Sequence, residues 1–96
     1  MNLIDATHEL FTDMVGDSFS IEAEDVNAIE LASVEVKPSA DGTRRAPFVL
    51  TFHGPVDVLL EQSIYVLEHG KLGTLEIFLV PLDQDENHVL YEAVFN

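Results

Sequence analysis

The chain has 96 residues, of which 47% are hydrophobic, and its 18 Asp and Glu against 4 Lys and Arg give a net charge of −14. This length predicts a single domain, residues 1–96, and the apolar content excludes a disordered tail. The negative charge would repel phosphate backbones and anionic lipid. No apolar run approaches the roughly 18 residues of a membrane span, so we expect neither nucleic acid nor a membrane as a partner.

The sequence has no Cys, which excludes a disulfide framework, a thiolate nucleophile and a cysteine metal site. Its first residues contain no basic stretch followed by a long apolar one, so we expect no signal peptide. We therefore expect a cytoplasmic protein, with export by a route that needs no signal peptide as the alternative. The acidic residues are spread along the chain, so they serve either solubility alone or the attraction of a basic partner or a cation.

Residues 7–15 predict one short helix. Thr7 suits the N-cap, and Gly16 suits the position after the last turn. An apolar stripe at helical spacing consists of Leu10, Phe11, Met14 and Val15. Because so short a helix is marginal alone, we expect this stripe to pack against one open end or face of a sheet.

From residue 18 onward the apolar period changes from 3.6 to 2, which predicts strands. The expected strands cover residues 18–24, 27–36, 48–53, 63–68, 74–80 and 88–96. Within the second strand the apolar parity reverses between Leu31 and Val34. A reversal inside one strand predicts a β-bulge or a corner, here at Ala32–Ser33.

The strands over residues 63–68 and 74–80 carry apolar side chains on both parities. Ile64 is followed by Tyr65, and Phe78 lies between two other apolar residues. Strands of this kind are central and are covered by a helix, a second sheet or a partner. If Phe78 lies in the core, its replacement by Ala is expected to cost ~3–5 kcal/mol of stability.

Short connections at residues 70–73 and 82–87 predict antiparallel hairpins. Residues 56–61 are ambiguous, and they form either one helical turn or an apolar connection across the end of a barrel. The sequence therefore predicts a mainly β protein, a compact antiparallel barrel or rolled β-sandwich of about six strands with one N-terminal helix packed on it.

Four stretches carry a pattern that resembles a known family. They are F-x-L-x-F-x-G-P at residues 48–55, L-x-Q-x-x-Y-x-L-x-H at 60–69, L-G-x-L-x-x-F-L-V-P at 72–81 and Y-E-A-V-F-N at 91–96. The family comprises small bacterial proteins and is known only as a domain of unknown function, and Ser63 stands where its pattern has Gly. Some members lie beside genes for tail-fibre or tail-collar-like proteins, so the resemblance implies a phage-tail-like or secreted assembly. It implies no catalytic residues.

The four histidines, His8, His53, His69 and His88, show no spacing typical of a chelating pair, although His53 and His88 can share one end of the sheet. Asp83–Asn87 begins like a calcium loop, but His88 stands where such a loop requires Gly, so an acidic turn explains the segment better. No Ser lies in a nucleophile elbow, and no Gly-rich phosphate loop is present. We therefore expect no catalytic residue, no metal and no cofactor.

Five residues of the second half are candidates for a small binding patch: Gly54, Pro55, Gln62, Tyr65 and His69. The patch would lie near Gly54–Pro55, where a loop and the start of a strand meet, and such loops often carry binding residues. The alternative is structural, with Gln62 pairing a backbone group and Tyr65 capping the core with its hydroxyl outward.

Residues 37–47 predict a long loop with two Pro and an Asp-Gly turn. It carries three of the four basic residues, Lys37, Arg44 and Arg45. Because the rest of the chain is acidic, this segment is a candidate interaction loop, including for another copy of the protein. The alternative is an ordinary surface loop.

These observations favour a non-enzymatic protein-interaction or assembly module that binds a protein partner or itself. The alternative is a small ligand-binding or catalytic β-barrel with a pocket at one open end. An assembly module should bury its two-sided apolar strands at the contact, whereas a ligand barrel should have a concave pocket with polar groups.

Overall fold

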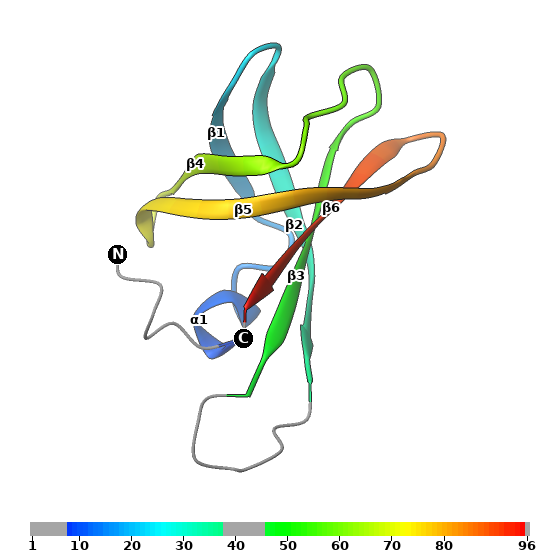
Figure 1. Cartoon of the computed structure of the whole chain (residues 1–96). Helices are drawn as coiled ribbons and strands as arrows, with labels where there is room; N and C mark the ends of the chain where they lie inside the picture. The colour runs from blue at the N-terminus through cyan, green and yellow to red at the C-terminus, as the bar shows by residue number, and fades with distance from the viewer. Residues whose placement is uncertain (1–7, 38–45, 96) are drawn as a thin grey trace.

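The computed structural model of the chain describes residues 8–37 and 46–95. In this part of the chain the elements are α1 (His8–Thr12), β1 (Ser18–Ala23), β2 (Val26–Val36), β3 (Phe48–Pro55), β4 (Ser63–His69), β5 (Gly73–Gln84) and β6 (His88–Phe95). The six strands form a closed antiparallel barrel in the order β1-β2-β3-β6-β5-β4, in which β4 also pairs with β1 (Figure 1). The predicted mainly β fold with one N-terminal helix is confirmed.

The barrel consists of two meanders, β1-β2-β3 and β4-β5-β6, which meet where β3 pairs with β6 and where β1 pairs with β4. The connection between the meanders, residues 56–62, contains no regular helix or strand and runs over the upper end of the barrel in Figure 1. Of the two interpretations of residues 56–61, the apolar connection is therefore the correct one. This connection forms part of the candidate site.

Two bulges bend the strands. In β2, Leu31 pairs with Phe52 and Ser33 with Thr51, so Ala32 is the extra residue, as the parity reversal predicted. In β5, the register shifts between Pro81 and Asp83. Because Pro is tolerated at bulges, β5 continues through Pro81 to Gln84. The connection to β6 is therefore residues 85–87, which is shorter than the predicted 82–87.

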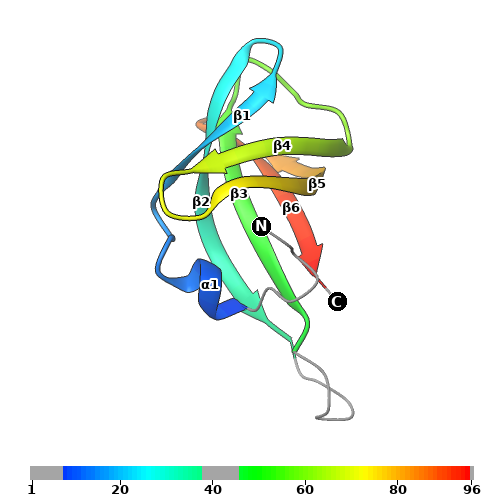
Figure 2. The same ribbon diagram turned by 90° about the vertical axis from the view of Figure 1, so that its left-hand side faces the viewer.

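The helix α1 lies at the lower end of the barrel (Figure 2), and aromatic side chains pack together beneath it. Phe48 and Phe95 stack with their ring centroids 4.7 Å apart, and Phe11 of α1 lies within 6.0 Å of both rings. The apolar stripe of the helical segment therefore packs at one end of the barrel, as expected. Val15 is the exception, because its side chain is 45% exposed. Gly16, at φ 92°, ends this segment and donates its amide to the carbonyl of Leu31 over 2.8 Å. The predicted N-cap Thr7 lies outside the described residues.

Along the part of the chain that the structure describes, no helix is long and apolar enough to cross a membrane.

Candidate functional site

The predicted binding residues lie at two ends of the barrel. Gly54 and Pro55 end β3, and Gln62 is exposed just before β4. Tyr65 lies near the start of β4 and His69 at its end, so the same strand separates these two side chains. Of the five, Tyr65 lines a groove at the upper end of the barrel.

Gly54 has a packing role beside this groove. A Cβ atom at position 54 would lie 2.8 Å from Cε2 of Tyr91 and 3.5 Å from Cγ2 of Ile29. Only Gly therefore lets the buried ring of Tyr91 approach β3 this closely. The hydroxyl of Tyr91 in turn accepts a hydrogen bond from the amide of Leu60 over 2.9 Å.

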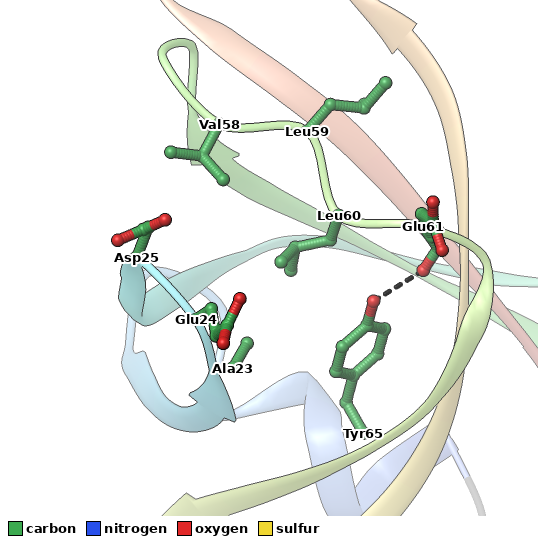
Figure 3. A pocket seen from close by; sticks show the side chains of 8 residues that line it. All are labelled: Ala23, Glu24, Asp25, Val58, Leu59, Leu60, Glu61 and Tyr65. Atoms are coloured by element: carbon green, nitrogen blue, oxygen red, sulfur yellow. Dashed lines mark hydrogen bonds between the residues drawn. The ribbon is translucent and has the colours of Figure 1, made fainter.

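We call the cavity at the upper end the end groove (Figure 3). It is open to solvent on one side, has a volume of about 390 Å³, and is lined by Ala23, Glu24, Asp25, Val58, Leu59, Leu60, Glu61 and Tyr65. These residues come from the β1–β2 hairpin, the connection before β4 and β4 itself. The apolar side chains form its floor, and three carboxylates surround them, so the groove suits a ligand with an apolar body and a positive charge.

Tyr65 fixes one wall of the end groove. Its hydroxyl donates a hydrogen bond to the carbonyl oxygen of Glu61 over 2.6 Å (Figure 3). Burial, with smaller contributions from Tyr91 and the Glu61 carboxylate, raises the pKa of Tyr65 above its usual value. The phenol therefore stays protonated at neutral pH and continues to donate this hydrogen bond.

His69 has a structural role at the other end of β4. Its Nε2 lies 2.8 Å from Oδ2 of Asp17, and its Nδ1 accepts a hydrogen bond from the amide of Lys71 over 3.0 Å. Because Nδ1 accepts, the ring proton lies on Nε2 and is donated to Asp17. The buried ring also contacts Phe19 at a centroid distance of 4.7 Å. Both ring nitrogens are therefore engaged, and His69 joins β4 to the turn before β1.

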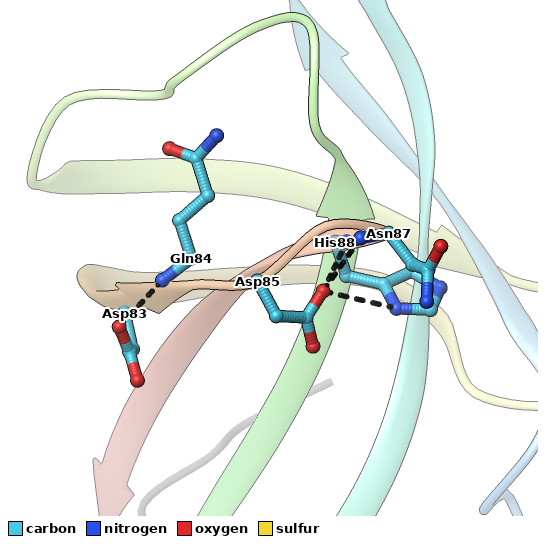
Figure 4. Close-up of polar contacts among 5 residues, drawn as sticks. All are labelled: Asp83, Gln84, Asp85, Asn87 and His88. Carbon is cyan, nitrogen blue, oxygen red and sulfur yellow. Dashed lines mark hydrogen bonds and ion pairs between the residues drawn. The ribbon is translucent and has the colours of Figure 1, made fainter.

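The acidic turn after β5 is held by its own carboxylates (Figure 4). Oδ1 of Asp85 accepts hydrogen bonds from the amides of Asn87 and His88 over 2.8 and 2.7 Å. These hydrogen bonds are the main reason that the pKa of Asp85 lies below its usual value. The interpretation of Asp83–Asn87 as a turn rather than a calcium loop fits this geometry.

His53 and His88 do share one end of the barrel. Their rings stack with centroids 4.5 Å apart, and Nδ1 of His88 lies 4.0 Å from Oδ1 of Asp85. Within the described residues, however, no group of three or more His, Asp or Glu side chains is arranged to hold a metal ion.

The outer face of β4 and β5 carries exposed apolar side chains. We call Ile64, Val66, Phe78 and Val80 the apolar platform. Ile64 pairs with Phe78 across the two strands, and the two residues are 63% and 48% exposed. Val66 and Val80 lie two residues further along the same faces and are half-buried. Phe78 therefore does not lie in the core, because Ile77 and Leu79 hold the inward parity of β5, and the condition for a large loss of stability in Phe78→Ala is not met.

Two acidic side chains lie beside the apolar platform. Glu76 pairs with Val66, and Glu92 of β6 pairs with Val80, so both carboxylates lie beside the platform on the outer face. No described element of the chain covers Ile64 or Phe78. The platform is thus an apolar surface with a carboxylate at two of its edges.

Of the three basic residues of the predicted interaction loop, Lys37 lies within the described residues. Lys37 follows β2, and its Nζ forms an exposed ion pair with Oε1 of Glu35 at 2.7 Å. Its amide donates to the carbonyl of Pro47 over 2.7 Å, which closes the base of the loop. Arg44 and Arg45 lie outside the described residues.

The sequence reasoning missed most of the end groove. Residues 23–25 and 58–61 carry no chemical motif, and only the strand order, with β1 beside β4, brings them together. The apolar platform was easier to predict from the sequence, since its residues produce the pattern of apolar side chains on both faces of β4 and β5.

The fold defines a small closed antiparallel β-barrel of six strands with a short N-terminal helix across the described residues. The chain belongs to the family described as Domain of unknown function (DUF6916), whose model matches residues 6–95. No curated protein and no solved structure matches the chain.

Proposed function

We propose that this domain is a non-enzymatic protein-interaction module that docks a protein partner on the apolar platform. The observation that supports this function is the exposed cross-strand pair of Ile64 and Phe78. A neighbouring apolar pair on a strand surface is normally buried against another layer, and exposed apolar patches with a polar rim typically mark interaction sites. We infer that a partner protein covers Ile64 and Phe78.

The charges around the platform define the partner's chemistry. With Glu76 and Glu92 at its edge and a chain charge of −14, the platform favours a partner surface with an apolar centre and basic residues around it. A second copy would bring the same negative charge, so a different protein is favoured over self-association at low salt. On the family resemblance, we propose a phage-tail-like or secreted assembly as the setting.

To test this function, the wild type and a platform variant are each used for affinity capture from the native lysate, and the captured proteins are compared. The variant is Ile64→Thr with Phe78→Thr, because Thr keeps β propensity at exposed strand positions while it removes most of the apolar surface. We expect the wild type to capture one stoichiometric protein, and the platform variant to lose it.

Val15→Thr is the matched control, because Val15 is 45% exposed and follows α1, away from the platform. The control should retain the same partner, and high salt should weaken the capture by screening the acidic edge. A partner retained by the platform variant would contradict the proposed docking surface. A wild type that captures no specific protein, or only further copies of itself, would contradict the proposed partner.

A further inference from the structure

We propose that the end groove is a second recognition site, which binds the side chain of an arginine carried by a peptide segment of a partner. Figure 3 shows Glu24 and Asp25 on one side of Leu60 and Glu61 on the other. None of the eight residues that line the groove is basic. A positively charged group that enters it therefore meets carboxylates on two sides and no like charge among the lining residues.

The floor of the groove explains why the cation should have an apolar stem. Leu60 is buried at the base, Val58 is half-buried beside it, and Leu59 is 62% exposed at the lip. A bare metal ion would gain nothing from these surfaces, and the metal-ligand geometry is absent among the described residues. The methylene groups of an arginine side chain would cover the floor while its guanidinium stays at the acidic rim.

Arginine fits this site better than lysine for two physical reasons. Its guanidinium is planar, so it can donate two parallel hydrogen bonds to one carboxylate and can lie against the ring of Tyr65. It is also more weakly hydrated than an ammonium group, so it loses less on entering a partly apolar groove. A leucine-like neighbour in the peptide would then cover the exposed Leu59.

The wall of the groove is fixed before any ligand arrives. The amide of Leu60 donates to the buried hydroxyl of Tyr91, and the hydroxyl of Tyr65 donates to the carbonyl of Glu61. Two hydrogen bonds from two different strands thus hold residues 60 and 61. A groove held in this way loses little conformational entropy on binding.

The end groove is distinct from the apolar platform. Tyr65 lines the groove whereas its neighbour Ile64 belongs to the platform, because successive residues of β4 point to opposite faces. Platform variants should therefore leave arginine binding intact, and the two proposals can fail separately.

The test is a titration of the full chain, labelled with ¹³C and ¹⁵N, with the blocked tripeptide Leu-Arg-Leu, followed by NMR. We expect saturable shifts confined to the amides of residues 23–25 and 58–61 and to the ring of Tyr65. The same tripeptide with citrulline, which has the shape of arginine without its charge, should not bind. n-Propylguanidinium is the arginine side chain without its backbone and has the same single charge, and we expect it to bind at least about tenfold more weakly because it has no apolar neighbours.

The groove variant Glu24→Gln, Asp25→Asn and Glu61→Gln should weaken tripeptide binding about tenfold, since three rim carboxylates lose their charge. Asn suits position 25 because Asp25 has φ 64° and Asn tolerates this conformation. The control variant, Glu9→Gln, Glu22→Gln and Glu86→Gln, removes the same number of exposed carboxylates elsewhere and should bind as the wild type does.

Several outcomes would overturn the inference. They are the absence of saturable shifts at the groove, equal binding of the citrulline peptide, equal weakening in the control variant, or n-propylguanidinium binding as tightly as the tripeptide. Loss of binding in the Ile64→Thr, Phe78→Thr variant would also overturn it, because the site would then not be separate from the platform.

Discussion

At the scale of single residues, Gly54 shows how one missing side chain positions an aromatic ring. The ring of Tyr91 occupies the space that a Cβ atom at position 54 would need. The same ring carries the hydroxyl that holds Leu60 at the end groove. A packing requirement in β3 therefore determines the geometry of a groove formed by other segments.

Replacing Gly54 by Ala should destabilise the protein by ~1–3 kcal/mol, because the added methyl group overlaps Tyr91 in a filled core. Gly70→Ala is the control, since a Cβ atom there meets nothing within 4 Å. The control should change stability by no more than ~0.5 kcal/mol. Urea unfolding measures both, and equal stability of the two variants would contradict the packing role.

Asp85 illustrates a carboxylate whose ionised form stabilises a turn. Its pKa in the folded state is lower than the usual 3.8, chiefly because of hydrogen bonds from the amides of Asn87 and His88. A lowered folded-state pKa means that the stabilisation is fully present above pH 3.8 and is lost as pH falls through the folded-state pKa. The acidic turn should therefore weaken in this acid range.

The variant Asp85→Ala tests this pH dependence. Its difference in urea midpoint from the wild type should be constant above about pH 5 and should shrink towards about pH 2. Glu86→Ala is the control, because Glu86 is an exposed neighbour in the same turn. A difference for Asp85→Ala that stays constant over the whole range would show that its carboxylate charge has no part in the turn.

At the scale of elements, the connection between β3 and β4 depends on tertiary hydrogen bonds rather than on its own structure. Residues 56–62 form no helix or strand, yet two tyrosine hydroxyls hold Leu60 and Glu61. The hydrogen bond to Tyr91 is buried, whereas that from Tyr65 is exposed. The two should therefore differ in strength.

Tyr91→Phe should destabilise the protein by ~1–3 kcal/mol, since it leaves the buried amide of Leu60 without a partner. Tyr65→Phe should have a smaller effect, ~1 kcal/mol or less, because water can replace its hydrogen bond. Urea unfolding of both variants gives this comparison. The reverse order would mean that the buried hydrogen bond does not hold the connection.

The fully buried side chain of α1 is that of Phe11. Phe11 is fully buried against Phe48 and Phe95, whereas nearby Val15 faces solvent. Phe11→Ala should destabilise the protein by ~3–5 kcal/mol, because it leaves a cavity at the lower end of the barrel. Val15→Ala should change stability by ~0.5 kcal/mol or less. Thermal unfolding distinguishes them, and a Phe11→Ala variant as stable as the wild type would show that α1 contributes no packing.

The elements were predictable where the signal is local. The reversal of apolar parity between Leu31 and Val34 predicted the bulge at Ala32, because successive side chains of a regular strand point to opposite faces. The two-sided pattern of β5 could not show which parity faces inward, so only the structure shows that Phe78 lies on the outer face. The end groove was not predictable, since residues 23–25 and 58–61 meet only through the order of the strands.

At the scale of the whole molecule, the barrel separates packing from recognition. Among the described residues, every strand of the closed sheet pairs with a neighbour on each side over at least part of its length, which limits the edge on which a partner could add a strand. In the function that we propose, recognition depends on side chains of the outer face and of the barrel end. Both the apolar platform and the end groove combine apolar surface with carboxylates, which agrees with a net charge of −14.

Hydroxyl-radical footprinting of the captured complex tests the proposed docking surface most directly, because it reports the solvent access of single side chains. Our account predicts that oxidation of Ile64 and Phe78 falls severalfold when the partner is bound, while oxidation of the similarly exposed Val15 stays constant. Undiminished oxidation of Ile64 and Phe78 in a saturated complex would contradict the claim that the partner docks on the apolar platform.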